Sequence, residues 1–415
     1  MPLHYFRGLR RRGVDVWLLT HARVRDELTD TLKDDVSLVV FIEDTWLHRI
    51  CWRIGSWMPE RIGWAWEHVT LGLATQYAQR AIVRRMVKSR GIRVIHQPTP
   101  VSPRAPSLMF GLGAPVIIGP MNGGMEYPPA YRRRFEGVLT RVLVKFGRVW
   151  SHLANLCVPG KYFAARLLVA NERTRRALPL GCKRRAAILV ENGVLDVDSP
   201  ELIKEKLSRP PSPASFVFVG RLIDWKGVDL LLEAFAQLTH KREAALNIIG
   251  DGSQRPSLEA LARRLGIERQ ISFRGFRPRE ECLEAIRGAT ALVLPSLLEC
   301  GGAVVLEAMS VATPVIAMDW GGPSDYVDSA CGVLIPPQTA EDFITDLARA
   351  MEKLANDRSF GAELGCRGSE RARRCFTWDA KIDQILDQYA SVTLGTSPAE
   401  IQPNETLTAT ESRPR

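Results

Sequence analysis

The residues best suited to chemistry stand between Glu299 and Glu307, in the sequence Glu-Cys-Gly-Gly-Ala-Val-Val-Leu-Glu. An apolar run at 291–294 predicts a buried strand just before them, and a helix is expected to begin near Ala303. Open α/β sheets bind ligands at the carboxyl ends of their strands, and a helix N-terminus attracts diphosphate groups. The two glycines would let backbone N–H groups approach a ligand closely. We therefore predict a site for a phosphorylated, hydroxyl-rich ligand; the alternative is two surface glutamates on an ordinary loop.

A second loop offers two cations. The sequence from Gly220 to Gly227 reads Gly-Arg-Leu-Ile-Asp-Trp-Lys-Gly and follows the apolar run at 216–219, the first strand expected in the second half of the chain. Arg221 and Lys226 lie on this loop, where they could neutralise a leaving diphosphate without a metal ion. Gly220 would permit a tight turn at the sheet edge. The alternative for Lys226 alone is a solvated residue at a helix cap.

Three further positions follow strands that we expect in the first half of the chain. His96 lies next to the run at 94–95, and Asn122 and Gly123 lie in the loop Gly-Pro-Met-Asn-Gly-Gly after the run at 116–118. Because ligands bind at such strand ends, these residues are candidates for a substrate cleft. For His96 the alternative is a structural, hydrogen-bonded histidine, and for Asn122 it is a plain turn.

Metal sites and cofactors have little support in the sequence. Asp196-Val-Asp198 has the Asp-x-Asp spacing of some metal sites, but it stands just before a linker, and we interpret it as a solvated turn. Eight cysteines are scattered without a Cys-x-x-Cys pair. This pattern favours reduced thiols in the cytoplasm over a disulfide framework or a zinc site. We therefore predict no metal and no cofactor.

Strands and helices alternate along almost the whole chain, which predicts an α/β fold with parallel sheets covered on both faces. Strands are expected at residues 14–19, 38–42, 94–95, 116–118, 167–170 and 187–190, and again at 216–219, 245–249, 271–273, 291–294, 315–318 and 332–335. Two such sets indicate two Rossmann-like domains, at 1–195 and 215–375, joined by a linker at 196–214. Residues 394–415 are rich in Thr, Ser, Pro and Glu and are expected to be disordered.

The beginning of the chain departs from this rhythm. Leu3, Phe6 and Leu9 predict a helix that Gly13 ends, and the run at 14–19 follows as the first strand. A doubly wound domain normally opens with a central strand and a glycine-rich turn, so this pattern predicts that the first strand is missing. We expect a start assigned too far downstream rather than a true loss, and we expect no signal peptide.

Charge is divided unevenly between the two halves. Residues 1–195 hold 31 Lys and Arg against 14 Asp and Glu, a net charge of +17, whereas the whole chain carries +10. A basic half favours an anionic partner, such as a phosphorylated substrate or an anionic membrane. For any single basic cluster the alternative is a solvated helix face.

Tryptophan is concentrated at residues 46–66, which hold five of the chain's ten tryptophans together with three arginines. Tryptophan and arginine suit a membrane interface, although the same residues could line a substrate groove or pack in a core. No apolar run approaches the ~20 residues needed to cross a bilayer, so any membrane contact would be peripheral.

Several motifs in order resemble the signature of the family 4 retaining glycosyltransferases. They are Gly220-Arg-x4-Lys226-Gly227, Gly250-Asp-Gly252, Phe273-Arg-Gly275, Glu299-x7-Glu307, Pro314-Val-Ile-Ala and Gly321-Gly322. The resemblance is close over about 215–390 and looser before that, through Val190-Glu-Asn-Gly-Val194. It implies a GT-B fold, in which two Rossmann-like domains face each other across a cleft and a helix at 376–393 crosses back to the first domain.

The resemblance also implies a role for each matching residue. Arg221 and Lys226 would hold the donor diphosphate, Glu299 would contact the donor sugar, and Glu307 would bind the ribose. The remaining implied donor-binding residues are Gly220, Gly275, Phe276, Gly301, Gly302 and Ala303. The co-substrate would be a nucleotide-sugar such as a UDP- or GDP-sugar. The sugar would move with retention and without a metal to a glycan or lipid-linked acceptor near His96, Asn122 or Gly123.

Some positions depart from the family's pattern. Gly301 stands where an aromatic residue is common, the 119–124 loop lacks a frequent histidine, and the first glycine-rich turn is missing. The alternative function is therefore a catalytically impaired nucleotide-sugar-binding protein. A dinucleotide-dependent oxidoreductase is disfavoured because no Gly-x-Gly-x-x-Gly follows a strand, and no nucleic-acid-binding motif accompanies the basic charge. We expect a cytoplasmic protein, with the inner face of the membrane as one candidate position.

Overall fold

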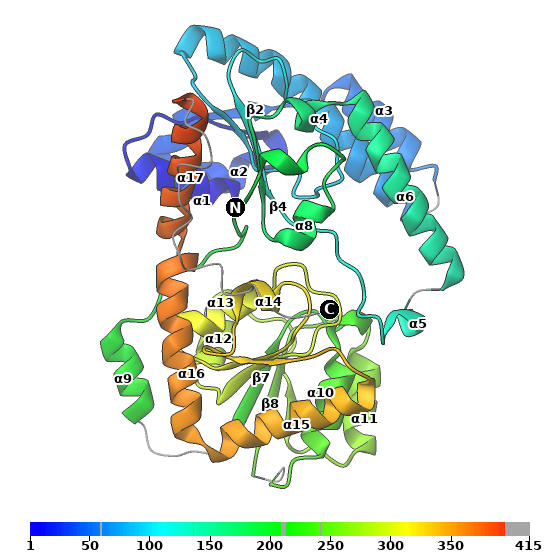
Figure 1. Ribbon diagram of the computed structural model, residues 1–415, viewed down its shortest axis with the longest axis vertical. Coiled ribbons are helices and arrows are strands. Elements are labelled where there is room, and N and C mark those ends of the chain that lie inside the picture. Colours follow the sequence, from blue (N-terminus) through cyan, green and yellow to red (C-terminus); the bar gives the residue numbers. More distant parts are fainter. Residues whose placement is uncertain (59, 136, 209–212, 241–242, 395–415) are drawn as a thin grey trace.

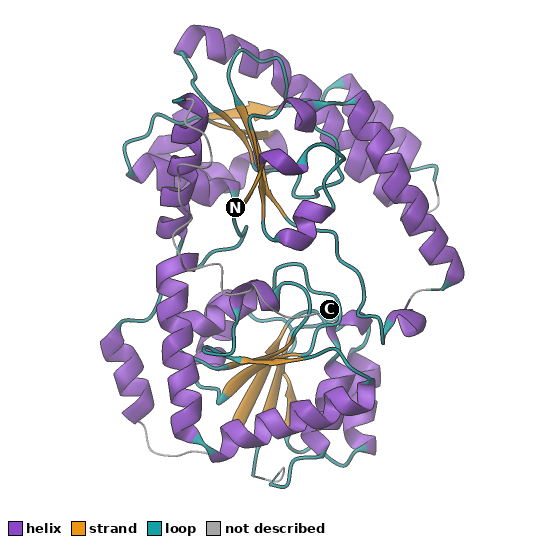
Figure 2. Ribbon diagram, in the orientation of Figure 1, coloured by secondary structure: helices purple, strands orange, loops and turns teal. Residues whose placement is uncertain are grey.

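The computed structural model describes residues 1–58, 60–135, 137–208, 213–240 and 243–394. Two α/β domains lie one above the other, each built around parallel strands (Figure 1; Figure 2). The predicted fold class of two Rossmann-like domains is confirmed. Residues 395–415, where the sequence predicts disorder, and 209–212 of the predicted linker lie outside the described residues.

The C-terminal domain contains a six-stranded parallel sheet in the order β12-β11-β10-β7-β8-β9. Its strands are β7 (Ser215–Val219), β8 (Ala245–Ile249), β9 (Ile271–Phe273), β10 (Ala291–Leu294), β11 (Val315–Met318) and β12 (Val333–Ile335). Its helices are α10 (Val228–Ala236), α11 (Arg255–Arg264), α12 (Arg279–Arg287), α13 (Ala303–Ser310), α14 (Pro323–Tyr326) and α15 (Ala340–Asn356). The strands β10 and β11 are buried along their whole length, because each is a continuous apolar run covered on both faces.

The N-terminal domain divides its strands between two parallel sheets. One pairs β1 (Leu18–His21) with β2 (Val39–Ile42), and the other has the order β3 (Ile95–Gln97), β4 (Val116–Met121), β5 (Arg166–Val169) and β6 (Ala186–Ile188). The first expected strand, 14–19, is wrong at its beginning. Val14 donates its N–H to the Leu9 carbonyl oxygen at 3.1 Å and so completes the end of the preceding helix. Within the described residues no strand joins the two sheets.

Helices make up much of the N-terminal domain. They are α1 (Pro2–Arg11), α2 (Arg25–Leu32), α3 (Trp46–Gly55), α4 (Glu60–Arg90), α5 (Arg132–Phe135), α6 (Val138–Cys157), α7 (Gly160–Phe163) and α8 (Glu172–Arg176). In the view of Figure 1, α3 and α6 lie on the same flank of the domain. None of the helices in the described part of the chain combines the length and the apolar character needed to cross a membrane.

The chain passes twice between the domains. The first passage runs from β6 into α9 (Pro200–Ser208), and the second from α16 (Arg358–Arg371) through a π-helical turn at Ala372–Phe376 into α17 (Trp378–Thr393). The two passages are hydrogen-bonded to each other: the Val194 N–H donates to the Phe376 carbonyl oxygen at 2.9 Å, and the Trp378 N–H donates to the Val194 carbonyl oxygen at 3.0 Å. Helix α17 then packs against α1 in the N-terminal domain.

Candidate functional site

Lys226 and Glu299 meet at the top of the C-terminal sheet. Their side chains form an ion pair between Nζ and Oε2. They come from the loops after β7 and β10, which are neighbouring parallel strands, so the carboxyl ends of these strands lie together. The two side chains are only 14% and 12% exposed, which limits screening of the pair by salt. The structure thus brings two of the predicted residues together at the edge where α/β sheets bind ligands.

The glycine pair fits this loop for two different reasons. Gly302 is the N-cap of α13 and has a φ of +71°, a left-handed conformation that favours glycine. At Gly301 a Cβ would lie 2.3 Å from Asn192 Nδ2 and 2.6 Å from Glu191 Oε1, so these two side chains would have to shift to admit the aromatic residue common in the family. The first N–H groups of α13, beginning at Ala303, have no acceptor within the helix and are therefore suited to an anion.

Arg221 is the exposed cation of the site. Among the described residues no carboxylate forms an ion pair with it. The neighbouring Gly220 lacks the positive φ of the tight turn that the sequence suggests. A Cβ at Gly220 would make a tight contact of 3.1 Å with Phe218 Cζ, whereas a Cβ at Gly250 would lie only 1.9 Å from the Gly220 carbonyl oxygen, so glycine is required at position 250.

Glu307 and Phe276 lie further along the same face of the domain. Glu307 is paired with Arg279, whose Nε lies 2.9 Å from Oε1. Gly275 has a φ of +67°, and its carbonyl oxygen accepts the Gly250 N–H at 2.8 Å. This backbone turn leaves the Phe276 ring 83% exposed. An exposed ring beside a glycine-lined strand end is a suitable surface for stacking a planar base.

Asn122 contacts both domains. Its Nδ2 donates to Glu191 Oε1 at 2.6 Å and to the carbonyl oxygen of Cys300, in the loop between Glu299 and α13, at 3.0 Å. The side chain is 6% exposed, and burial raises the pKa of the neighbouring Glu191. Gly123 packs beside it and donates its N–H to Thr174 Oγ1 at 3.1 Å. The Asn122 amide thus holds the site loop against the N-terminal domain, and a place for Asn122 in the acceptor cleft stays a prediction.

A pocket of about 230 Å³ lies between the domains. It is lined by Met125, Glu126, Arg173, Trp320 and Gly321. Trp320 Nε1 donates to the Glu126 carbonyl oxygen at 2.7 Å and so bridges the two domains. A Cβ at Gly321 would lie 2.5 Å from the Glu299 carbonyl oxygen, which places this pocket directly beside the Lys226–Glu299 pair.

Sequence reasoning missed the charged residues that border this pocket. Arg173 Nη2 lies 3.5 Å from Asp325 Oδ2, and Asn171 Nδ2 donates to the same oxygen at 2.6 Å. Burial raises the pKa of Asp325 to about 6. Arg173 lies in a run of arginines on α8, and only its contacts distinguish it from the solvated members of that run. Glu191 belongs to a motif of the resemblance and was the one residue of this group within reach of sequence reasoning.

His96 is held on both sides by the protein. Its Nδ1 lies 2.8 Å from the Tyr389 hydroxyl on α17, and its Nε2 lies 2.6 Å from the Gly119 carbonyl oxygen. The carbonyl can only accept, so Nε2 carries a proton and Nδ1 accepts the hydroxyl of Tyr389. Because both nitrogens are engaged, the structure favours the structural alternative over a place for His96 in the cleft.

The surroundings of His96 predict an acid sensitivity. Burial lowers the pKa of His96 to about 4, below the ordinary value of 6.5 for an unfolded chain. Between these values the unfolded chain binds the extra proton, so the stability from this residue is present above pH 6.5 and is lost as the pH falls toward 4. The loss should reach about 3 kcal/mol. Urea unfolding of wild type and His96→Asn at pH 7 and pH 4.5 measures it.

The stability difference between the two proteins should shrink at the lower pH, because the variant has no imidazole to protonate. A His240→Asn variant, changed at an exposed histidine, serves as the control and should follow wild type at both values. An unchanged difference between wild type and His96→Asn would contradict this account.

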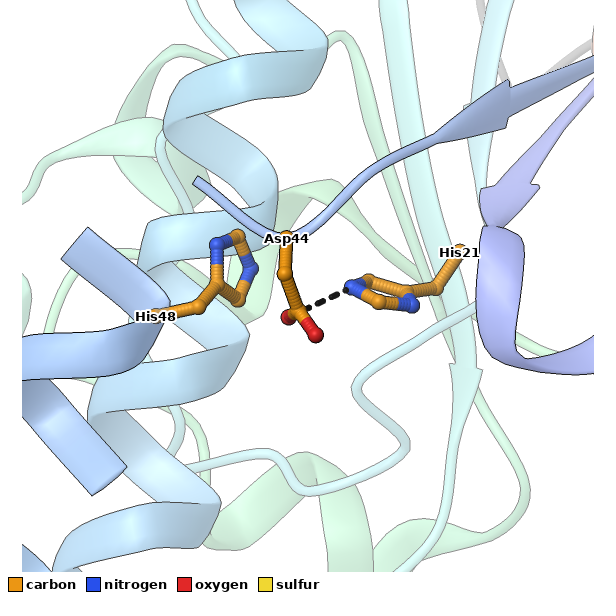
Figure 3. Close-up of side chains that lie close together, drawn as sticks. All are labelled: His21, Asp44 and His48. Atoms are coloured by element: carbon orange, nitrogen blue, oxygen red, sulfur yellow. Dashed lines mark ion pairs between the residues drawn. The ribbon is translucent and has the colours of Figure 1, made fainter. Parts of the chain in front are cut away.

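A cluster of His21, Asp44 and His48 lies at the carboxyl ends of β1 and β2 (Figure 3). His21 Nε2 lies 3.3 Å from Asp44 Oδ1. The three side chains could be taken for a metal site, since one ligand atom from each lies within 4.8 Å of the others. The hydrogen bonds of the two rings test that interpretation.

Three of the four ring nitrogens of this cluster already have hydrogen-bond partners. His48 Nδ1 accepts the Thr45 N–H at 3.1 Å, and His48 Nε2 lies 2.9 Å from the Thr75 hydroxyl. His21 Nδ1 accepts the Arg23 N–H at 3.2 Å, whereas His21 Nε2 faces Asp44 Oδ1 at 3.3 Å without a hydrogen bond. The Arg23 guanidinium also lies 3.0 Å from Asp44 and supplies the positive charge that a metal would bring. These contacts fit a hydrogen-bonded cluster better than a set of metal ligands.

The Asp-x-Asp sequence is only partly the solvated turn that we predict. Asp196 is exposed, but the Asp198 side chain is 13% exposed and forms a two-pronged ion pair with Arg287, at 2.9 and 3.0 Å. Asp198 therefore fixes the beginning of the linker to α12 of the C-terminal domain. The sequence could not reveal a partner 89 residues away.

Comparison with known proteins shows which proteins this domain resembles. Residues 199–366 match the family described as Glycosyl transferases group 1. A 209-residue stretch is 32% identical to the D-inositol 3-phosphate glycosyltransferase of Streptomyces bingchenggensis, covering 48% of this chain and 45% of that protein. The chain spans about half the length of the curated relatives it matches.

Solved structures extend the likeness to both domains. A glycosyltransferase from Rickettsia africae superposes with a TM-score of 0.60 at 13% identity, covering 95% of this chain and 94% of the other. Anabaena HepE in complex with UDP gives a TM-score of 0.57 at 16% identity, covering 88% and 89%. These similarities show a shared GT-B fold. The C-terminal domain is thus similar to the glycosyl transferases of group 1, and the two domains together have the GT-B fold.

Proposed function

We propose that this protein is a glycosyltransferase that moves a sugar from a nucleotide-sugar donor to a glycan or lipid-linked acceptor. The observation that carries the proposal is the Lys226–Glu299 ion pair beside the N-terminus of α13, with the exposed Arg221 on the same loop as Lys226. A donor has one end that is anionic and another that is rich in hydroxyls. This group of residues offers cations for the first and a carboxylate for the second.

The diphosphate of the donor would be held by Arg221, Lys226 and the first N–H groups of α13. When the bond between the sugar and the diphosphate breaks, negative charge grows on the departing oxygen. Cations and N–H groups already placed there lower the free energy of that state. This arrangement supports transfer without a metal ion, and the resemblance to the family supports retention at the anomeric carbon.

The rest of the donor would lie along the same edge of the sheet. Phe276 offers an exposed ring for the base, and Glu307 offers a carboxylate oxygen for the ribose hydroxyls, in competition with Arg279. Glu299 would accept hydrogen bonds from the sugar hydroxyls, while Lys226 would form an ion pair with the diphosphate. The acceptor would enter from the N-terminal domain beside Asn122 and Gly123. HepE, which shares the fold, is known in complex with UDP, and this supports a uridine donor among the candidates.

The proposed compartment is the cytoplasm. All eight cysteines are free in the structure, although several are close to the surface. Free thiols persist in a reducing compartment, and oxidising compartments favour disulfides.

The proposal is tested by thermal-shift and calorimetric titration with UDP, GDP and ADP and their sugar conjugates, in the presence of EDTA. One nucleotide family should stabilise the protein saturably, by about 2.7 kcal/mol at a hundredfold excess over Kd. Arg221→Ala should weaken this binding about tenfold or more, because a charged hydrogen bond is lost. The control Arg263→Ala, at an exposed arginine of α11, should bind as wild type does.

Binding that requires a divalent metal would contradict the metal-independent mechanism. A folded protein that no nucleotide stabilises would favour the alternative of a protein with an impaired site.

A further inference from the structure

Helix α6 carries its apolar side chains outward. Phe146, Val149, Trp150 and Leu153 are 66%, 61%, 62% and 49% exposed. Their spacing of i, i+3, i+4 and i+7 places them along one stripe of the helix. A stripe of this kind normally faces a protein core, so its exposure indicates a surface that another apolar phase covers.

Two polar residues on the opposite side of α6, where Val144 is 41% exposed, contact the rest of the protein. Asn155 is fully buried and donates to the Arg104 carbonyl oxygen at 2.8 Å. Arg148 forms an ion pair with Glu126 on the loop that lines the interdomain pocket. The orientation of the helix is therefore fixed by these polar contacts. If the helix rotated so that the apolar stripe faced the protein, the contacts of Asn155 and Arg148 would break.

Helix α3 presents a second face of the same kind. Trp46 and Ile50 of the helix are 62% and 47% exposed, and Trp57, two residues beyond its end, is 86% exposed. Arg49 and Arg53 are exposed on the same helix. The N-terminus of the helix is fixed by a capping box between Thr45 and His48, and Trp66 of α4 donates to the carbonyl oxygen of Cys51 at 3.2 Å. The tryptophans thus project from an anchored helix.

Charge indicates which partner covers these faces. Neither α3 nor α6 contains an Asp or Glu, whereas together they contain five Arg and Lys. In a two-fold pairing of this surface with a second copy, basic helices would face basic helices, at an electrostatic cost. Exposed tryptophan beside arginine suits the headgroup region of a bilayer, and the positive charge selects anionic lipids.

We infer that α3 and α6 dock the N-terminal domain on an anionic membrane surface. The apolar stripe of α6 and the tryptophans of α3 would enter the headgroup region, and Arg49 and Arg53 would lie at the level of the lipid phosphates. This inference does not depend on the proposed sugar transfer. It concerns where the protein binds and not what reaction it catalyses.

Flotation of the full chain with phospholipid vesicles tests the inference. One set contains phosphatidylcholine alone and the other includes about 30% phosphatidylglycerol. The protein should partition at least about tenfold more strongly onto the anionic vesicles, because neutral vesicles lack the electrostatic attraction. Trp150→Glu combined with Leu153→Glu should reduce binding to both sets about tenfold or more.

Two further variants separate the contributions. Arg49→Glu combined with Arg53→Glu should abolish the preference for anionic vesicles. Leu202→Glu introduces the same charge at a 52% exposed leucine of α9, outside the surface, and should bind as wild type does. Equal melting temperatures establish that all variants are folded.

Two results would overturn the inference. One is binding to anionic vesicles no stronger than to neutral ones. The other is a dimer in sedimentation experiments that Trp150→Glu and Leu153→Glu dissociate, which would assign this surface to a second copy of the chain.

Discussion

Replacing Glu299 with glutamine is expected to reduce sugar transfer at least about a hundredfold while the protein remains folded and binds nucleotide. The Glu299 carboxylate is the partner of Lys226, and it is mostly buried at the top of the sheet. Glutamine has nearly the same shape and can still accept one hydrogen bond from a sugar hydroxyl. It cannot carry the negative charge that orients Lys226 and that would stabilise positive charge developing on the reacting sugar. Single-turnover transfer, measured beside nucleotide affinity, separates these roles.

The expected pattern for Glu299→Gln is a large fall in turnover with a nucleotide Kd within about threefold of wild type, as when an interaction acts chiefly in the transition state. Glu280→Gln, at an exposed glutamate of α12, provides the matched control and should keep wild-type turnover. Near-normal turnover of Glu299→Gln would show that this carboxylate does not take part in the reaction.

Replacing Asn122 with aspartate should destabilise the protein by about 3–5 kcal/mol at pH 8, because it buries a charge without a partner. The new carboxylate would face Glu191 Oε1 and the Cys300 carbonyl oxygen, which now accept hydrogen bonds at 2.6 and 3.0 Å. Three hydrogen-bond acceptors would then lie close together with no donor between them. Chemical unfolding at pH 8 measures the loss.

Asn122→Ala is the natural comparison, since it removes the hydrogen bonds without adding charge. Its cost should be smaller, about 1–3 kcal/mol. Burial already raises the pKa of Glu191. At lower pH a shared proton can therefore relieve the aspartate variant, and the two variants should converge. If Asn122→Asp were as stable as wild type at pH 8, the contact between Asn122 and the site loop would not exist in solution.

The C-terminal domain and its loops could be predicted closely from the sequence. The strands β8 to β11 begin and end where the apolar runs do, and β10 and β11 are apolar throughout because both of their faces are buried. Glu299 and Lys226 directly follow two of those runs. Strand ends of a parallel sheet lie at one edge, so both residues could be placed near a ligand before any contact between them was known.

The parts that could not be predicted depend on contacts between distant segments. The periodicity of α6 reveals a stripe but not whether it faces the core, and that is decided by Asn155 and its bond to Arg104. The role of Asn122 depends on Glu191 and on Cys300, which stands 178 residues later. His96 could be weighed between two interpretations, but Tyr389 on the returning helix decides between them.

The paired passages between the domains determine how the cleft can open. Val194 is hydrogen-bonded to Phe376 and to Trp378, which lie on either side of the end of the π-helical turn. We therefore expect the two segments that connect the domains to rotate together. Arg134 on α5 and Asp229 on α10 are paired at 2.8 Å on the side of the molecule opposite these passages (Figure 1). An opening of the two domains about the passages would have to break this ion pair.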